Sequence, residues 1–204
     1  MAHLDDHQLD LTDWEAAWAP YDETTYRAAL DLIEPGDVVL DIGAGDLRFA
    51  RRAASRARSV IAIERRADLL NASRPDNVVV VCGDALRVPF PAGVSVGVLL
   101  MRHCRHYAEF ADTLRAAGCR KLITNARWGM DVELVRLDTQ LDFEAAAPGW
   151  YACDCGAAGF KACQPEQLTA ATLARTTHVA TCPACCISQP AIGRVDGWSG
   201  SRLA

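Results

Sequence analysis

The chain has 204 residues, half of them hydrophobic, and a formal net charge of −5 at pH 7. This length suits one well-buried domain, and the acidic balance argues against a broad, sequence-independent grip on nucleic acid, although a local basic patch stays open. No stretch approaches the roughly 20 apolar residues of a membrane span, and the first residues lack the basic and apolar regions of a secretory signal. We therefore expect a cytoplasmic protein with no membrane partner, and its oligomeric state stays open.

From residue 38 onward, short apolar runs alternate with segments of helical pattern. A first helix is expected over Glu23–Ile33, where Pro35 and Gly36 end it. Runs rich in Val, Ile and Leu suit strands buried on both faces of a parallel sheet. Such strands are expected at Val38–Leu40, Val60–Ile63, Val78–Val81, Val94–Met101 and Lys121–Thr124, and helices at Leu47–Arg58, Arg66–Ser73 and Ala108–Ala117. The alternation predicts an α/β fold with a doubly wound, Rossmann-like, mostly parallel sheet.

Beyond the fifth strand the pattern loosens, and Asp131–Leu137 is ambiguous between helix and strand. A hairpin is expected at Trp150–Cys155 and Gly159–Lys161, followed by a helix at Pro165–Arg175 and a strand at Thr177–Thr181. We predict four parts, which are an N-terminal helical segment and lid at 1–36, a Rossmann-like core at 37–128, a C-terminal completion of the fold with a cysteine-rich lobe at 129–187, and a flexible tail at 188–204.

The strongest chemical motif follows the first expected strand, which ends at Asp41 and turns through Gly43 and Gly45. Glycines allow the backbone to approach a ligand closely, and open α/β sheets bind small molecules at the carboxyl ends of their strands. Glu64 closes the second strand, where a carboxylate can accept hydrogen bonds from both hydroxyls of a ribose. Asp84 follows the third strand, where it can accept from an adenine amino group.

In order and spacing these motifs resemble the class I S-adenosylmethionine-dependent methyltransferases, over about residues 37–126. The resemblance implies methyl transfer, with the glycine turn around the methionine moiety, Glu64 at the ribose, Asp84 at the adenine and Met101 near the sulfonium. The cofactor-binding residues that it implies are Asp41, Gly43, Ala44, Gly45, Glu64, Arg65, Asp84, Ala85 and Met101. Leu47 departs from the pattern, since many members carry a third glycine there.

Two other interpretations of the glycine turn stay open. The glycines can simply form a tight strand-to-helix connection without a ligand. A nicotinamide-dependent oxidoreductase would instead need a glycine at the position of Arg48, whose long side chain would obstruct close helix packing. The methyltransferase interpretation is the one we adopt.

Residues after the fourth and fifth strands would face the methyl acceptor. His103 is the candidate catalytic base, with a structural histidine as the equal alternative. Arg102, Arg105 and Arg127 either clamp an anionic substrate or solvate the rim. The Asn- or Asp-Pro-Pro-Tyr-like run of adenine N6 methyltransferases does not follow the fourth strand. The region after the fourth strand, whose helix leads through Ala117 and Gly118 into Lys121, most resembles small-molecule methyltransferases. This resemblance implies a small-molecule acceptor, with an RNA or protein substrate, or a non-catalytic cofactor-binding module, as alternatives.

Six of the nine cysteines lie in the last third of the chain. The pair Cys182/Cys185 has the spacing of a zinc knuckle, whereas Cys153/Cys155 departs from it with one fewer intervening residue but is followed by Gly156, which permits a close approach. Four thiolates would give a closed tetrahedral zinc site. These four are predicted to hold a structural zinc ion that stabilises the C-terminal lobe. The alternatives are free thiols, a redox site, or the replacement of one ligand by Cys163, Cys186 or His178.

Overall fold

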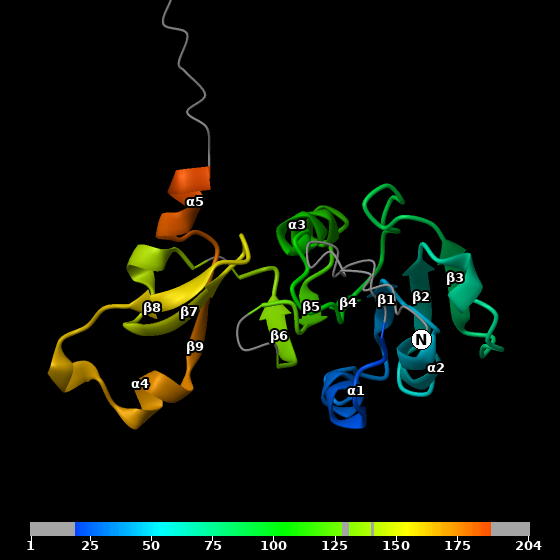
Figure 1. Ribbon diagram of the computed structural model, residues 1–204, viewed down its shortest axis with the longest axis horizontal. Helices are drawn as coiled ribbons and strands as arrows, with labels where there is room; N and C mark the ends of the chain where they lie inside the picture. Colours follow the sequence, from blue (N-terminus) through cyan, green and yellow to red (C-terminus); the bar gives the residue numbers. More distant parts are fainter. Residues whose placement is uncertain (1–18, 128–130, 140, 189–204) are drawn as a thin grey trace, which may run out of the picture.

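The computed structural model describes residues 19–127, 131–139 and 141–188, which form two β-sheets with helices around them (Figure 1). The larger sheet has the strand order β3-β2-β1-β4-β5-β6. Its strands are β1 Val38–Ile42, β2 Ser59–Glu64, β3 Val78–Cys82, β4 Val96–Leu99, β5 Lys121–Thr124 and β6 Glu133–Arg136. The first five are parallel and β6 pairs antiparallel with β5. The predicted doubly wound, mostly parallel sheet is confirmed.

Helices cover both faces of this sheet. Helix α1 (Glu23–Leu30) and helix α2 (Arg48–Ala53) bury Tyr26 and Phe49 against β1, β2 and β4 on one face. Helix α3 (Tyr107–Ala116) buries Phe110 and Leu114 on the other face. In Figure 1 the two groups of helices accordingly lie on opposite sides of the strands. Every residue of β4 is buried, as expected for a strand covered from both sides.

The segment between β2 and β3 differs from its prediction. The helix expected over Arg66–Ser73 is only a 3₁₀ turn, η1, at Ala67–Leu69. None of the turn residues is buried, so no tertiary packing offsets the cost of nucleating a longer helix. The helix expected over Pro165–Arg175 is likewise divided, into η4 (Pro165–Gln167) and α4 (Ala170–Ala174), because Thr169 starts a new cap there.

The C-terminal lobe contains a second, three-stranded sheet in the order β8-β7-β9. The expected hairpin is confirmed as β7 (Gly149–Cys153) and β8 (Ala158–Lys161), and β9 (Thr176–Val179) pairs parallel with β7. The short turn η3 (Phe143–Ala145) precedes the sheet, and α5 (Pro183–Ser188) follows it.

The predicted domain boundaries stay predictions, and the tail at 189–204 lies outside the described residues. Within the described ranges, no helix has the length and apolar character to cross a membrane.

Gly97 on β4 sets how closely α3 approaches the sheet. A Cβ at this position would lie 2.5 Å from Leu114 Cδ1, and Leu114 is fully buried and has little room to move. We expect Gly97→Val to lower the free energy of unfolding by about 1–3 kcal/mol through overpacking, measured by urea denaturation. Gly36→Ala is the control, because nothing lies within 4 Å of a Cβ added there. Equal stabilities of the two variants would contradict this packing.

Candidate functional site

The turn between β1 and α2 is anchored to the carboxyl end of β2. Gly43 and Gly45 both have positive φ values, of 72° and 55°, a conformation that glycine adopts without steric cost. The amides of Gly43 and Ala44 both donate to the carbonyl of Ile63, at 2.9 and 3.0 Å. The Gly45 amide donates to Glu64 Oε2 at 2.8 Å. The glycine motif and the strand-ending carboxylate are therefore one unit.

Glu64 has a structural task in addition to its predicted ligand contacts. Its Oε1 accepts from the Arg66 amide at 2.8 Å, while Oε2 holds Gly45, and only 7% of the residue is exposed. An ionised carboxylate offers about four acceptor positions, so roughly two stay available to a ligand. That number suits the two vicinal hydroxyls of a ribose.

The departure at Leu47 has a physical explanation. Leu47 adopts φ 63° and ψ 13°, the left-handed conformation that glycine favours. A residue with a Cβ pays roughly 1–2 kcal/mol for this conformation. The Leu47 side chain is fully buried in the core beneath α2, and burial of a leucine contributes about 1.5–3 kcal/mol. Packing thus offsets the backbone strain.

A cavity of about 670 Å³ opens at the carboxyl ends of the strands. Eight of the nine predicted cofactor-binding residues line it. The ninth, Gly45, does not line the cavity but donates a hydrogen bond to Glu64, which does. Tyr21, which precedes the first helix and is a candidate lid residue in the sequence, also lines the cavity. Its hydroxyl accepts from the Arg102 amide at 2.8 Å, and its ring lies 5.0 Å from the Arg102 guanidinium carbon, so Tyr21 ties the segment before α1 to the end of β4. The other two candidate lid residues, Trp14 and Trp18, lie outside the described residues.

Asp41 is a buried carboxyl group of the cavity that uses only part of its hydrogen-bonding capacity within the described ranges. It is 3% exposed, and its Oδ2 has no hydrogen-bond partner among the described residues. Burial, together with the nearby Glu64 carboxylate, raises the pKa of Asp41 from 3.8 to about 7. The unfolded chain therefore ionises at lower pH than the folded chain, and the free energy of unfolding falls as pH rises from about 4 to about 7. A cation bound beside Asp41 would remove this penalty.

The acceptor side of the cavity is formed by the loop after β4. His103 and His106 both line the cavity, and His103 has a φ of 61°, which is uncommon for a residue other than glycine. Such conformations cost about 1–3 kcal/mol and often occur at functional sites.

Asn125, at the end of β5, is fully buried, and neither polar atom of its side chain has a partner within the described ranges. The sequence placed Asn125 among the acceptor-side residues after the fifth strand, but it gave no sign that the amide would be buried without partners.

The four predicted cysteines converge in the C-terminal lobe. The Sγ atoms of Cys153, Cys155, Cys182 and Cys185 all lie within 4.8 Å of one another. Three of the separations are 3.6 Å (Cys153–Cys185), 3.7 Å (Cys155–Cys182) and 3.8 Å (Cys182–Cys185). A tetrahedron of sulfurs around an ion at about 2.3 Å has edges of about 3.8 Å. Cys163 and His178 are not members of the cluster, and the side chain of Cys186 lies outside the described part.

Comparison with known proteins agrees with this geometry. Residues 40–125 match the family model described as "Methyltransferase domain". A segment of 64 residues is 39% identical to the probable ribosomal RNA small subunit methyltransferase A of Methanosarcina acetivorans, and it covers 29% of this chain and 24% of that protein. Residues 40–125 are a class I methyltransferase domain. The chain thus spans about a quarter of the length of that relative.

Solved structures that resemble this chain match about half of it. A dimethyladenosine transferase from Plasmodium falciparum is 18% identical with a TM-score of 0.45, over 50% of this chain and 41% of that chain. The 23S rRNA methyltransferase ErmE is 24% identical with a TM-score of 0.43, over 53% of this chain and 47% of that chain. Neither likeness identifies the acceptor of this methyltransferase domain.

Arg127 joins the methyltransferase domain to the cysteine lobe. Its side chain is 2% exposed and makes a two-pronged pair with Glu133 on β6, with both N–O distances 2.8 Å. Its Nη1 donates to His178 Nδ1 on β9 at 2.7 Å, and its guanidinium lies 5.5 Å from the centre of the Tyr107 ring on α3. Arg127 is therefore neither the substrate clamp nor the solvated rim residue that the sequence suggested.

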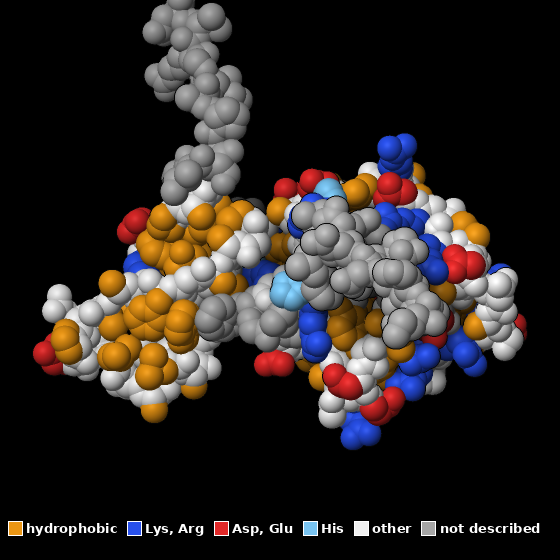
Figure 2. Space-filling view, viewed as in Figure 1, with side chains coloured by type: hydrophobic (Ala, Val, Ile, Leu, Met, Phe, Trp, Pro, Cys, Tyr) orange, Lys and Arg blue, Asp and Glu red, His pale blue; other side chains and the backbone are white. Residues whose placement is uncertain are grey.

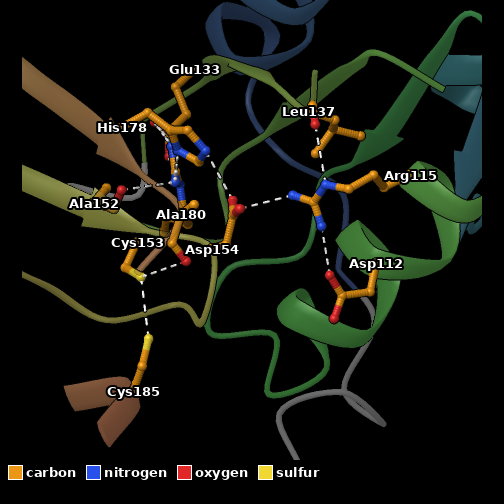
Figure 3. Close-up of polar contacts among 11 residues, drawn as sticks. Asp112, Arg115, Glu133, Leu137, Ala152, Cys153, Asp154, His178, Ala180 and Cys185 are labelled. Carbon is orange, nitrogen blue, oxygen red and sulfur yellow. Dashed lines mark hydrogen bonds and ion pairs between the residues drawn. The ribbon is translucent and has the colours of Figure 1, made fainter. Parts of the chain in front are cut away.

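A second set of contacts reaches the turn between Cys153 and Cys155. Because a guanidinium only donates, His178 Nδ1 must accept from Arg127, which places the ring proton on Nε2. Nε2 lies 2.9 Å from Oδ1 of Asp154, the residue between Cys153 and Cys155. The other oxygen of Asp154 accepts from Arg115 Nη2 on α3 at 2.8 Å (Figure 3). The cysteine turn is thus held against the helix that follows the acceptor loop.

Arg127 should be essential for stability. We expect Arg127→Ala to lower the free energy of unfolding by about 3–5 kcal/mol, since Glu133 and His178 would lose a buried partner. Arg136→Ala is the control, because its pair with Asp138 is 55% exposed on the arginine side and should contribute at most about 1 kcal/mol. Denaturant unfolding measures both. Similar losses for the two variants would show that the Arg127 contacts do not bind the lobe.

Proposed function

We propose that this chain transfers the methyl group of S-adenosylmethionine to an acceptor at the rim of the 670 Å³ cavity. The carboxylate Oδ2 of Asp41, buried beside the glycine turn and without a hydrogen-bond partner in the described part of the chain, is the observation that carries the proposal. A buried carboxylate without a partner lowers the stability of the fold, and ionisable groups with such perturbed pKa values cluster at ligand-binding and catalytic sites. S-adenosylmethionine supplies a cationic sulfonium and ammonium group and a methyl that is already activated for transfer.

The residues of the cavity fit this cofactor. Asp41 provides the counter-charge, and the two acceptor positions that Glu64 keeps free suit the ribose hydroxyls. Asp84 uses Oδ1 to accept from the Leu86 amide at 3.0 Å, and its Oδ2 lies 3.7 Å from Arg87, so part of its acceptor capacity stays available for an adenine amino group. The contacts of all nine predicted residues with the cofactor belong to this proposal.

Catalysis by this site requires mainly positioning. Holding the acceptor in line behind the methyl can supply on the order of 7–11 kcal/mol when the geometry is ideal. The constrained loop at His103 presents an exposed imidazole at the acceptor side of the cavity. His103 acts there as a base when the acceptor must lose a proton.

Different observations favour a small-molecule acceptor and an RNA acceptor. The cavity has the size of an ordinary small-molecule site, which agrees with the small-molecule acceptor predicted from the sequence. RNA is favoured by Arg65, Arg66 and Arg102, which line the same cavity, and by the matched relative, whose name is that of a ribosomal RNA methyltransferase. We adopt RNA as the acceptor. The cytoplasmic location stays a prediction.

The second part of the proposal is a structural zinc ion in the cysteine cluster. Three of the sulfur separations, 3.6–3.8 Å, match the edge of a tetrahedral zinc–thiolate site to within about 0.2 Å. The lobe buries few large side chains, so it has little apolar core of its own. One zinc ion would connect the β7–β8 turn to the start of α5 and so replace that core.

The pH dependence of cofactor binding tests the first part. Asp41 is protonated below about pH 7, and only its ionised form attracts the cation. The Kd for S-adenosylmethionine, measured by calorimetry, should therefore rise about tenfold from pH 8 to pH 6, which means weaker binding at the lower pH. Asp41→Asn should bind more weakly and lose this dependence, whereas Asp76→Asn, an exposed carboxylate outside the cavity, should behave like the wild type. Absence of binding by the wild-type protein would overturn the proposed function.

Elemental analysis tests the second part. Purified protein should contain about one zinc per chain, and Cys182→Ser should lower both the zinc content and the thermal stability, because a three-thiolate site is open and weaker. Cys163→Ser is the matched control, since this cysteine lies outside the cluster. A folded wild-type protein without metal, with all its thiols reactive, would exclude the zinc site.

A further inference from the structure

The positive charge of this acidic chain is concentrated in one segment. Residues 48–74 contain eight arginines but only two acidic residues, although the whole chain has a net charge of −5. The arginines are Arg48, Arg51, Arg52, Arg56, Arg58, Arg65, Arg66 and Arg74. This segment forms α2, β2, η1 and the approach to β3, and in Figure 2 most of the visible blue side chains lie over this half of the molecule.

Part of this segment forms a groove. It is lined by Arg48, Arg51 and Arg52 from α2 and by Ser73, Arg74 and Pro75 from the loop before β3. The three helix arginines have the i, i+3, i+4 spacing that places side chains on one face. We call this surface, with its four arginines, the arginine groove.

The arginines of the groove differ in their partners. Arg48 pairs with Asp46 at 2.9 Å, and Arg52 pairs with Glu23 at 2.8 Å. Arg51 and Arg74 are exposed, and among the described residues neither has an ion-pair partner. Unneutralised guanidinium groups on two sides of a groove attract anions, and their planar forks match the oxygens of a phosphate.

The arginine groove also lies next to the cofactor cavity. Asp46, the partner of Arg48, lines that cavity, as do Arg65 and Arg66. A chain of phosphates that lies in the groove can therefore continue along the arginines of the cavity rim. Repulsion from the acidic remainder of the surface would disfavour other positions.

We propose that the arginine groove binds the phosphodiester backbone of the RNA acceptor and directs one of its nucleotides to the cofactor cavity. The substrate identity rests on the proposed function, but the groove can be tested without methyl transfer. Such contacts position a substrate without reading its sequence. They displace counterions, so binding should weaken with salt, at a slope of about −0.7 in log K against log salt per neutralised phosphate of a single strand.

The test uses the full-length protein and a fluorescently labelled single-stranded RNA of mixed sequence, followed by anisotropy at several salt concentrations. The double variant Arg51→Ala/Arg74→Ala should bind at least tenfold more weakly, with a salt slope shallower by about 1.4. The double variant Arg120→Ala/Arg175→Ala has the same net charge but changes exposed arginines outside the groove, and it should bind like the wild type. Calorimetry with S-adenosylmethionine should give wild-type affinity for both.

Each other outcome is informative. Equal losses for the two double variants, or a loss confined to Arg120→Ala/Arg175→Ala, would overturn the groove as the RNA site. Competition by poly-glutamate as effective as that by unlabelled RNA would assign the groove to acidic proteins, and stronger binding of single-stranded DNA would assign it to DNA. RNA binding at the groove without any S-adenosylmethionine binding would refute the proposed function and leave the groove intact.

Discussion

The buried guanidinium of Arg127 is the contact on which the arrangement of the two sheets depends. It pairs with Glu133 on β6, bonds His178 on β9 and lies against Tyr107 on α3. A buried charge is tolerated only when its partners are in place, so this residue allows few relative positions of the lobe and the methyltransferase domain. Asp154 extends the same network to the turn that carries Cys153 and Cys155. The lobe is consequently part of the structure that carries the acceptor loop, and not a loosely attached module.

The proposed cofactor site, like the Arg127 network, contains groups that are unfavourable unless other contacts offset them. Leu47 adopts a glycine-like conformation that its burial offsets, and Asp41 has a buried oxygen without a partner among the described residues, close to the Glu64 carboxylate. Glu64 uses half of its acceptor capacity to hold the Gly45 and Arg66 amides. The site is therefore organised before a ligand arrives, and the interaction that would relieve Asp41 is the one that a cationic cofactor offers. Such preorganisation lowers the entropic cost of binding.

Much of the fold could be predicted because its signals are local. Runs of valine and isoleucine marked the parallel strands, and glycines marked the turn at the cofactor cavity. The helix expected over Arg66–Ser73 was wrong because its residues have helical propensity but no buried face in the structure. The strand β6 could not be distinguished from a helix by pattern alone, since its pairing with β5 decides its conformation. Weak local preferences yield to tertiary packing in both cases.

The sequence by itself determined the sheet, the cofactor motifs and the four clustered cysteines, because each depends on residue type and short-range spacing. Only the tertiary structure decided the tasks of residues whose partners are distant in the chain. Arg127 looked like a substrate ligand, but His178, 51 residues away, makes it a structural contact. Tyr21 became a wall of the cavity through Arg102, 81 residues away. Arg51 and Arg74 share a groove because the connection between β2 and β3 brings Arg74 beside α2. Such contacts depend on how strands and helices cross, which no local pattern encodes.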